Sequence, residues 1–174
     1  MSASGKSTLA FALECHLVDT GHACYVLDGD NIRHGLNKDL GFSHQDRTEN
    51  IRRIAEVARL MNEAGLVVIT AFISPYRDDR ALAQKIIDSE YFMEIYVNTS
   101  FKVCEKRDPK NMYKRARAGE LLEFTGVHSP YEPPVSIDTS TGTVAACVEK
   151  VFSELGCLIT VSESDMSERL EYPK

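Results

Sequence analysis

The sequence predicts an α/β fold with a mostly parallel sheet, and three observations point to it. Segments with helical periodicity alternate with short apolar segments rich in β-branched residues. The segment 66–74, LVVITAFIS, is almost continuously apolar, as is typical of a parallel strand buried on both faces. Polar residues cluster where the strands should end. Such alternation implies right-handed crossovers with helices on both faces of the sheet, and 174 residues with 43% hydrophobic content suffice for one such domain.

The elements are expected in the following order. The segment 6–20 carries an apolar helical face and stops before Gly21, and a long helix from Asp46 ends before Gly65. The expected helices cover residues 6–20, 46–64, 76–89, 100–108 and 142–155. The expected strands cover residues 23–30, 66–74, 92–98 and 157–162.

Composition excludes several classes of protein. The net charge is −6 and the pI is about 5.4, which argues against nonspecific binding to nucleic acids or anionic membranes. No apolar run approaches the roughly 18 residues of a membrane span, and no signal peptide precedes the domain. The five cysteines are scattered and form no C-x-x-C pair, which favours reduced thiols in a cytoplasmic protein.

The N-terminal GKST, residues 5–8, matches the second half of the phosphate-binding pattern G-x-x-x-x-G-K-S/T. Backbone N–H groups at the start of a helix attract phosphate oxygens, Lys6 would reach the β and γ phosphates, and the Ser7 hydroxyl would join a Mg²⁺ shell. The first glycine of the pattern and the strand before it are not in the sequence. A chance tetrapeptide in a surface loop is the alternative.

The stretch DGDNIR, residues 28–33, follows the first expected strand. Asp28 and Asp30 would hold a metal–water shell or draw a proton from a hydroxyl nucleophile, whereas Arg33 would pair with a phosphate. The alternative is an ordinary hairpin or Asx turn, because D-G is a common turn pair.

A third group of candidates lies at the start of the long helix. Arg47, Asn50 and Arg53 are spaced three apart, so they share one flank on which guanidinium groups would grip a phosphate or sulfate. Phe42 precedes them in a loop next to Gly41, where an exposed ring would stack on a base. The alternative is a solvated basic face with the phenylalanine packed inward.

Two further segments carry candidates. Ser74 ends an expected strand before Pro75, where its hydroxyl would act in the site or cap the next helix. The basic segment 106–117 suits a lid over phosphates, with a solvated run of charges as the alternative. Phe124, beside Thr125 and Gly126, offers a second aromatic plate opposite Phe42.

The ordered motifs closely resemble those of the adenylyl-sulfate kinase (APS kinase) family. They are SASGKST, DGDNIR, LGFSHQDRTENIRR, FISPY, RDPKNMYKRARAGE and FTGVHSPYEPP. The resemblance runs from Ser2 to about Cys157. It implies a P-loop NTPase-type three-layer α/β/α domain over residues 1–157, with residues 158–174 as a polar tail or linker. It also implies transfer of the γ-phosphoryl group of ATP to the ribose 3′-hydroxyl of adenosine 5′-phosphosulfate (APS), in sulfate assimilation.

The resemblance assigns roles to individual positions. The catalytic residues would be Lys6, Asp30 and Ser74, with Ser74 as a phosphoserine intermediate in family descriptions, although direct transfer needs only positioning and charge neutralisation. Mg²⁺ would be held by Ser7 and Asp30. ATP would be bound by Ala3, Ser4, Gly5, Lys6, Ser7 and Thr8. APS would be bound by Asp28, Gly29, Asp30, Asn31, Arg33, Phe42, Arg47, Thr48, Glu49, Asn50, Ile73, Ser74, Lys110, Glu123 and Phe124, with Phe42 and Phe124 enclosing its adenine.

The family pattern also sets expectations about partners and about the chain itself. It implies a homodimer and either a free enzyme or one fused to or associated with ATP sulfurylase, without nucleic-acid or membrane partners. The family has G-L-S-x-S-G-K-S-T after a hydrophobic strand, whereas this chain begins M-S-A-S-G-K-S-T, with Met1 where the leucine would be. We therefore expect a truncated N-terminus and a missing first strand. Two rivals stay open: another small-molecule kinase of the same fold, and a noncatalytic regulatory domain of an ATP sulfurylase.

Overall fold

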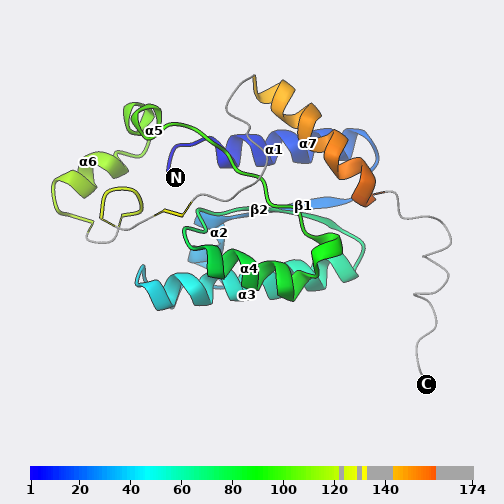
Figure 1. Cartoon of the computed structure of the whole chain (residues 1–174), viewed down its shortest axis with the longest axis horizontal. Coiled ribbons are helices and arrows are strands. Elements are labelled where there is room, and N and C mark those ends of the chain that lie inside the picture. Colours follow the sequence, from blue (N-terminus) through cyan, green and yellow to red (C-terminus); the bar gives the residue numbers. More distant parts are fainter. Residues whose placement is uncertain (122–123, 129–130, 133–142, 160–174) are drawn as a thin grey trace.

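The protein is built in three layers around a small parallel sheet. The computed structural model describes residues 1–121, 124–128, 131–132 and 143–159. In Figure 1 the helices α1 (Lys6–Asp19) and α7 (Val144–Ile159) cover one face of the sheet, and α3 (His44–Glu63) and α4 (Arg77–Ile87) cover the other. This arrangement confirms the predicted α/β/α class. The remaining elements are β1 (Cys24–Asp28), α2 (Gly29–His34), β2 (Val67–Ala71), the 3₁₀ turn η1 (Ser89–Tyr91), α5 (Phe101–Arg107) and α6 (Met112–Arg117).

The two strands are parallel and in direct register. Cys24 pairs with Val67 at the start of the ladder, and Asp28 pairs with Ala71 at its end. The connection between them runs through α2 and α3, and α3 packs on one face of the sheet, as parallel strands require. Both strands therefore point their carboxyl ends at the same edge, which is where the polar residues of DGDNIR and FISPY emerge.

Helix α3 begins at His44 because Ser43 caps it. The Ser43 hydroxyl accepts a hydrogen bond from the backbone N–H of Asp46 at 3.2 Å, which satisfies one of the unpaired N–H groups of the first turn. Its apolar flank then faces inward, where Ile54 packs with Leu27 of β1 and Ile51 packs with Ala83 of α4. The long helix is thus fixed to the sheet and to α4.

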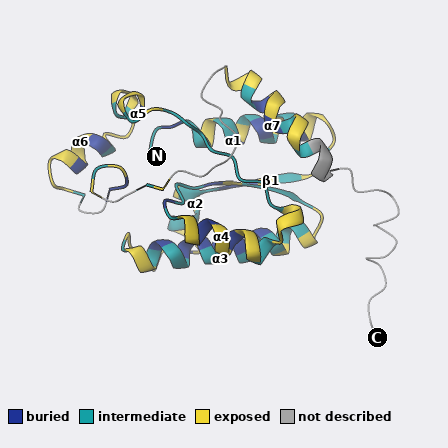
Figure 2. Ribbon diagram, viewed as in Figure 1, coloured by how far each residue is buried: buried dark blue, intermediate teal, exposed yellow. Residues whose placement is uncertain are grey.

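The opposite face of the sheet is covered by a second core. Leu13 and Leu17 of α1 meet Val148 and Val151 of α7, and Leu17 is fully buried. Figure 2 shows the same division, with buried residues on the inward sides of the helices and exposed ones outside. Because α1 is anchored by these contacts, its N-terminus is held at the edge where the strands end.

Two predicted strands are wrong. In residues 92–98 the backbone is extended at Phe92, and Tyr96 forms an isolated bridge. The described sheet consists of β1 and β2, and this segment forms no ladder with either strand. Residues 157–159 belong to α7, whose apolar periodicity continues to Ile159, while residues 160–162 lie outside the described residues. The first predicted strand also ends at Asp28, since Asp28 caps α2.

The structure contains no candidate for a membrane-crossing segment in the part of the chain that it describes. No helix there is both long and apolar enough to cross a bilayer.

We expect Leu17→Ala to lower the free energy of unfolding by about 2–5 kcal/mol, because it leaves a cavity between α1 and α7. The neighbouring Val18 is 58% exposed, so Val18→Ala serves as a matched control with an effect within about 0.5 kcal/mol. Urea unfolding of the two variants measures both values. Equal losses in the two would contradict the assignment of this core.

Candidate functional site

A large open cleft lies at the carboxyl ends of β1 and β2. Its volume is about 1910 Å³, which exceeds the roughly 300–1,000 Å³ of a pocket for one small ligand. It is lined by the N-terminal loop, by the start of α2, by the turn after β2 and by the segment before α6. The cleft is therefore large enough for two nucleotide-sized molecules side by side.

The N-terminal loop meets the cleft at the start of α1. Gly5 adopts a left-handed backbone with φ 99°, a conformation that glycine reaches without strain. Two distant side chains hold the loop: the Thr99 hydroxyl donates to the Ser4 carbonyl at 2.8 Å, and the Tyr113 hydroxyl donates to the Ser2 carbonyl at 3.0 Å. The first-turn N–H groups of α1, which have no helical acceptors, thereby form an anion-binding end.

Lys6 is the first residue of α1, directly after this loop, and is half-buried. Its ammonium group donates to the Met1 carbonyl at 2.6 Å and to the Ser4 hydroxyl at 3.5 Å. Burial lowers the pKa of Lys6, because a buried ammonium loses its hydration. An anion beside the Lys6 ammonium would offset the cost of its lost hydration, so Lys6 is suited to binding a phosphate.

The first carboxylate of DGDN faces the phosphate-binding loop. The Ser7 hydroxyl donates to Asp28 at 2.7 Å, and the other carboxylate oxygen of Asp28 accepts from the backbone N–H of Asp30 at 3.0 Å. Asp28 is thus also the Asx-type cap that the sequence left as an alternative. Asp28 can serve as a helix cap and as a site residue at once, because one of its oxygens caps α2 while the other contacts Ser7.

The second carboxylate is engaged elsewhere. Asp30 forms an ion pair with Lys110, and this hydrogen bond raises the pKa of Lys110. The carboxylate that contacts Ser7 is therefore Asp28 and not Asp30, the one assigned to the metal from the sequence.

The donor set at Ser7 fits Mg²⁺ held together with a nucleotide. The part of the chain described in the structure contains no group of three or more His, Cys, Asp and Glu side chains arranged for a metal. Mg²⁺ in kinases uses one or two protein oxygens and completes its shell with phosphates and water, so the Ser7 hydroxyl and the Asp28 carboxylate are a suitable pair.

At the other end of the cleft, Phe42 is paired with arginines. Its ring is 57% exposed, and the Arg33 guanidinium lies over it at 4.3 Å from the ring centre. Arg33 also donates to the Gly41 carbonyl at 2.8 Å, and burial lowers its pKa. Phe42 is thus exposed, as a stacking plate requires, and is not packed inward.

Arg47 and Asn50 line the same end and are both buried. Arg47 donates to the Phe42 carbonyl at 2.8 Å and to the Thr125 hydroxyl at 2.9 Å. The side-chain amide oxygen of Asn50 accepts a hydrogen bond from the side-chain amide of Asn37 at 3.0 Å. Phe124 also lines the cleft, but it is buried against Tyr113, with ring centres 5.0 Å apart in a T-shaped pair. That Phe42 and Phe124 enclose a base therefore stays a prediction.

The turn after β2 brings Ile73 and Ser74 to the cleft. Ser74 has φ 38°, a conformation that costs a non-glycine residue energy. Its carbonyl accepts from Arg80 at 2.8 Å, and Arg80 is further held by Glu94 at 2.6 Å and by the Glu132 carbonyl at 2.8 Å. Sequence reasoning missed Arg80, because only the fold brings its three partners together.

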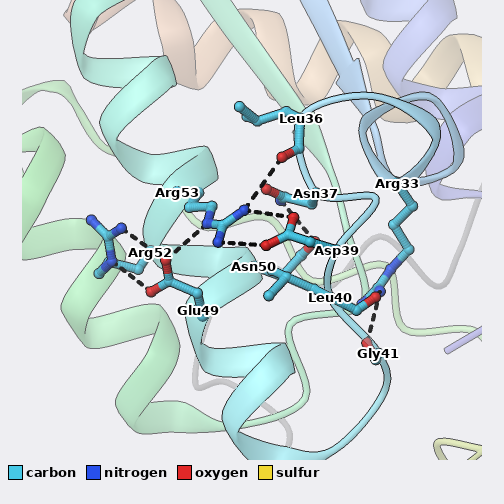
Figure 3. Close-up of polar contacts among 10 residues, drawn as sticks. All are labelled: Arg33, Leu36, Asn37, Asp39, Leu40, Gly41, Glu49, Asn50, Arg52 and Arg53. Atoms are coloured by element: carbon cyan, nitrogen blue, oxygen red, sulfur yellow. Dashed lines mark hydrogen bonds and ion pairs between the residues drawn. The ribbon is translucent and has the colours of Figure 1, made fainter.

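Most predicted site residues line one cleft. Those brought together are Ala3, Ser4, Gly5, Lys6, Ser7, Thr8, Asp28, Gly29, Asp30, Asn31, Arg33, Phe42, Arg47, Asn50, Ile73, Ser74, Lys110 and Phe124. Two others are turned away. The Thr48 hydroxyl donates to the His44 carbonyl at 3.2 Å, and Glu49 accepts from Arg52 and Arg53 (Figure 3). Glu123 lies outside the described residues.

A family model described as adenylylsulphate kinase matches residues 1–141. The chain belongs to this family. Its adenylyl-sulfate kinase relative from Pseudomonas entomophila is 56% identical over 159 residues, which are 89% of this chain and 76% of the relative. The one from Vibrio cholerae is 50% identical over 169 residues, 97% of this chain and 78% of the relative. Family membership confirms the kinase class expected from the motifs.

Solved structures of the family share the fold. A Mycobacterium tuberculosis APS kinase, determined in complex with AMPPNP and APS, superposes with a TM-score of 0.85 at 42% identity and covers 90% of this chain and 93% of its own. A hexameric APS kinase from Thiobacillus denitrificans gives a TM-score of 0.62 at 26% identity, covering 93% of this chain and 28% of its own. The P-loop NTPase fold expected from the sequence is thereby confirmed.

The ion pairs of Glu49 predict an acid-sensitive contribution to stability. Hydrogen bonds from Arg52 and Arg53 lower the pKa of Glu49 from 4.5 to about 2. Because the folded-state pKa is depressed, the contribution is complete above pH 4.5 and is lost as the pH falls toward 2. We expect Glu49→Gln to lower Tm above pH 4.5, with the difference from the wild type shrinking as the pH falls and vanishing near pH 2. Thermal unfolding across the window tests this, and a constant difference would contradict it.

Proposed function

We propose that this chain transfers the γ-phosphoryl group of ATP to the ribose 3′-hydroxyl of APS, giving 3′-phosphoadenylyl sulfate and ADP in sulfate activation. The observation that carries the proposal is a single cleft with a phosphate-binding helix end on one side and an arginine–phenylalanine surface on the other. The family supports it, because relatives are named adenylyl-sulfate kinase and one solved relative holds AMPPNP and APS.

The phosphate-binding side would take ATP. Residues 3–8 surround the start of α1, where backbone N–H groups and the Lys6 ammonium would hold the phosphates. Mg²⁺ bound at Ser7 would supply neutralisation of charge on the β and γ phosphates. Asp28 is the carboxylate next to Ser7, and Asp30 is the second carboxylate that the sequence offers to this site.

The arginine–phenylalanine side would take APS. Arg33 and Arg47 supply positive charge for its phosphosulfate, and the exposed Phe42 ring offers a face for adenine. The acceptor hydroxyl would then lie near Asp30, which lines the cleft between the two sides. The oxygen of this hydroxyl attacks the γ-phosphorus, and the bond between that phosphorus and the β–γ bridging oxygen breaks. The hydroxyl proton passes to the Asp30 carboxylate as ADP leaves.

Lys6 is the most direct test of the phosphate side. We expect Lys6→Ala to reduce kcat by about 100-fold or more, because the cation at the transferred phosphoryl group is removed. Lys102 is exposed on α5 and does not line the cleft, so Lys102→Ala is the matched control and should keep wild-type turnover. A coupled assay of ADP release with Mg-ATP and APS measures both.

The same assay separates the proposal from its rival. Release of ADP only when APS is present supports the kinase. Binding of APS without any turnover by the wild-type chain would overturn the kinase and favour the noncatalytic regulatory domain.

Ser74 distinguishes direct transfer from a covalent intermediate. We propose direct transfer, in which the Ser74 hydroxyl would supply no more than one hydrogen bond to the substrate, so Ser74→Ala should retain activity within about tenfold of the wild type. A phosphoserine route requires the hydroxyl itself and would lose all turnover. Mass spectrometry after incubation with ATP alone provides the second reading, and a phosphate on Ser74 there would contradict direct transfer.

Assembly and location stay expectations from the family resemblance. We propose a homodimer in the cytoplasm, with fusion to or association with ATP sulfurylase as the alternative arrangement. A relative from Thiobacillus denitrificans is hexameric, and this chain matches 28% of that protein's length. Light scattering of the purified chain would determine it here.

A further inference from the structure

The loop between α2 and α3, residues 35–42, carries Phe42 into the cleft and is held from two sides. Figure 3 shows arginines and asparagines gathered around it. On the cleft side, Arg33 donates to the carbonyls of Leu40 and Gly41 at 3.3 and 2.8 Å. Arg47 donates to the Phe42 carbonyl at 2.8 Å. Two of the cations proposed for the substrate therefore depend on where this loop lies.

On the other side, Arg53 of α3 grips the loop. Its two terminal nitrogens donate to the two carboxylate oxygens of Asp39, each at 2.9 Å, in the parallel geometry that fixes both groups in a plane. One of these nitrogens also donates to the Leu36 carbonyl at 3.3 Å. Neither Arg53 nor Asp39 lines the cleft.

Glu49, one turn earlier on α3, binds Arg53 and holds it in place. Its carboxylate accepts from the Arg53 Nε at 2.8 Å, which orients the guanidinium toward the loop. This contact accounts for Glu49, which the family resemblance assigns to the substrate although its side chain lies outside the cleft. It would act on the substrate through Arg53 and the loop.

A buried amide pair makes the second link. Asn37 is fully buried, and its side-chain amide donates to the side-chain amide oxygen of Asn50 at 3.0 Å. Asn50 lines the cleft and Asn37 does not. Because this bond fixes which end of the Asn50 amide faces Asn37, it also fixes which end is presented on the other side.

We propose that Asn37, Asp39, Glu49 and Arg53, the loop clasp, are positioning residues for the acceptor nucleotide. The clasp holds the 35–42 loop against α3, so that Phe42, Arg33 and Asn50 are prearranged before APS binds. This inference rests on the proposed function for its substrate. The hydrogen bonds that define the clasp join the 35–42 loop to α3 or lie within α3, and none of these four reaches residues 3–8, so the clasp acts on the affinity for APS and leaves the affinity for ATP unchanged.

The exposure of the pair sets the expected size of the effect. The Arg53 side chain is 28% exposed and that of Asp39 is 54% exposed, so water partly screens their attraction. We expect Arg53→Gln and Asp39→Asn each to raise KM for APS about two- to fivefold, the range that the loss of one such pair allows, with kcat and KM for ATP unchanged. Asp39→Glu, which keeps the carboxylate, should recover part of the loss.

Arg59 provides the matched control. It lies on the same helix and pairs with Glu56 and Glu63, and it makes no contact with the loop. Arg59→Gln therefore removes a comparable helix-surface arginine and should leave both KM values at those of the wild type. Hydrogen exchange of the backbone amides in residues 35–42 gives a reading independent of catalysis, and exchange should accelerate in Arg53→Gln and Asp39→Asn but not in Arg59→Gln.

The outcomes separate the clasp from the function on which it rests. Faster loop exchange together with a selective rise in KM for APS supports the proposal. Unchanged exchange, or an equal rise in both KM values, overturns it, because the first shows that the loop is not held there and the second indicates general damage to the fold. A wild-type chain that does not phosphorylate APS overturns the proposed function and the role toward APS, while loop exchange still decides whether the clasp orders the loop.

Discussion

The parallel pairing of β1 with β2 is the constraint on which the rest of the structure depends. It brings Asp28 and Ala71 to the same end of the ladder, so that the start of α2 and the turn at Ser74 emerge side by side. The crossover that parallel strands require places α3 on one face, and the core around Leu17 places α1 on the other. A helix end, two carboxylates and an arginine surface therefore meet at one edge of a small sheet.

Charge within the cleft is balanced locally. Asp30 is paired with Lys110, Asp28 accepts from Ser7, and Lys6 donates to a carbonyl and a hydroxyl oxygen. Lys6 and Asp28 could be matched more strongly by an ionic ligand than by their present neutral partners, because a phosphate or cation offers a full opposite charge, whereas Asp30 already has one in Lys110. A protein with a net charge of −6 thus places cationic groups next to carboxylates in one cleft.

The two sides of the cleft are supported differently. The phosphate side rests on distant contacts from Thr99 and Tyr113, which tie the N-terminal loop to the segment carrying α5 and α6. The other side rests on α3, which supplies Arg47 and Asn50 directly and orders the 35–42 loop through Arg53. The contacts made by α3 therefore support the binding of one nucleotide and not of the other.

The sequence alone determined the fold class, and most of the site residues that it predicts line the cleft, because hydrophobic periodicity and motif order are local properties. It could not distinguish a site residue from a supporting one. Arg47, Asn50 and Arg53 share a helix flank, yet Arg53 turns to Asp39 and away from the cleft. Likewise, the carboxylate that contacts Ser7 is that of Asp28 and not that of Asp30. Residues 92–98 do not form a strand, although their apolar and β-branched composition predicts one. Only the tertiary structure decided these points, since each depends on partners far apart in the chain.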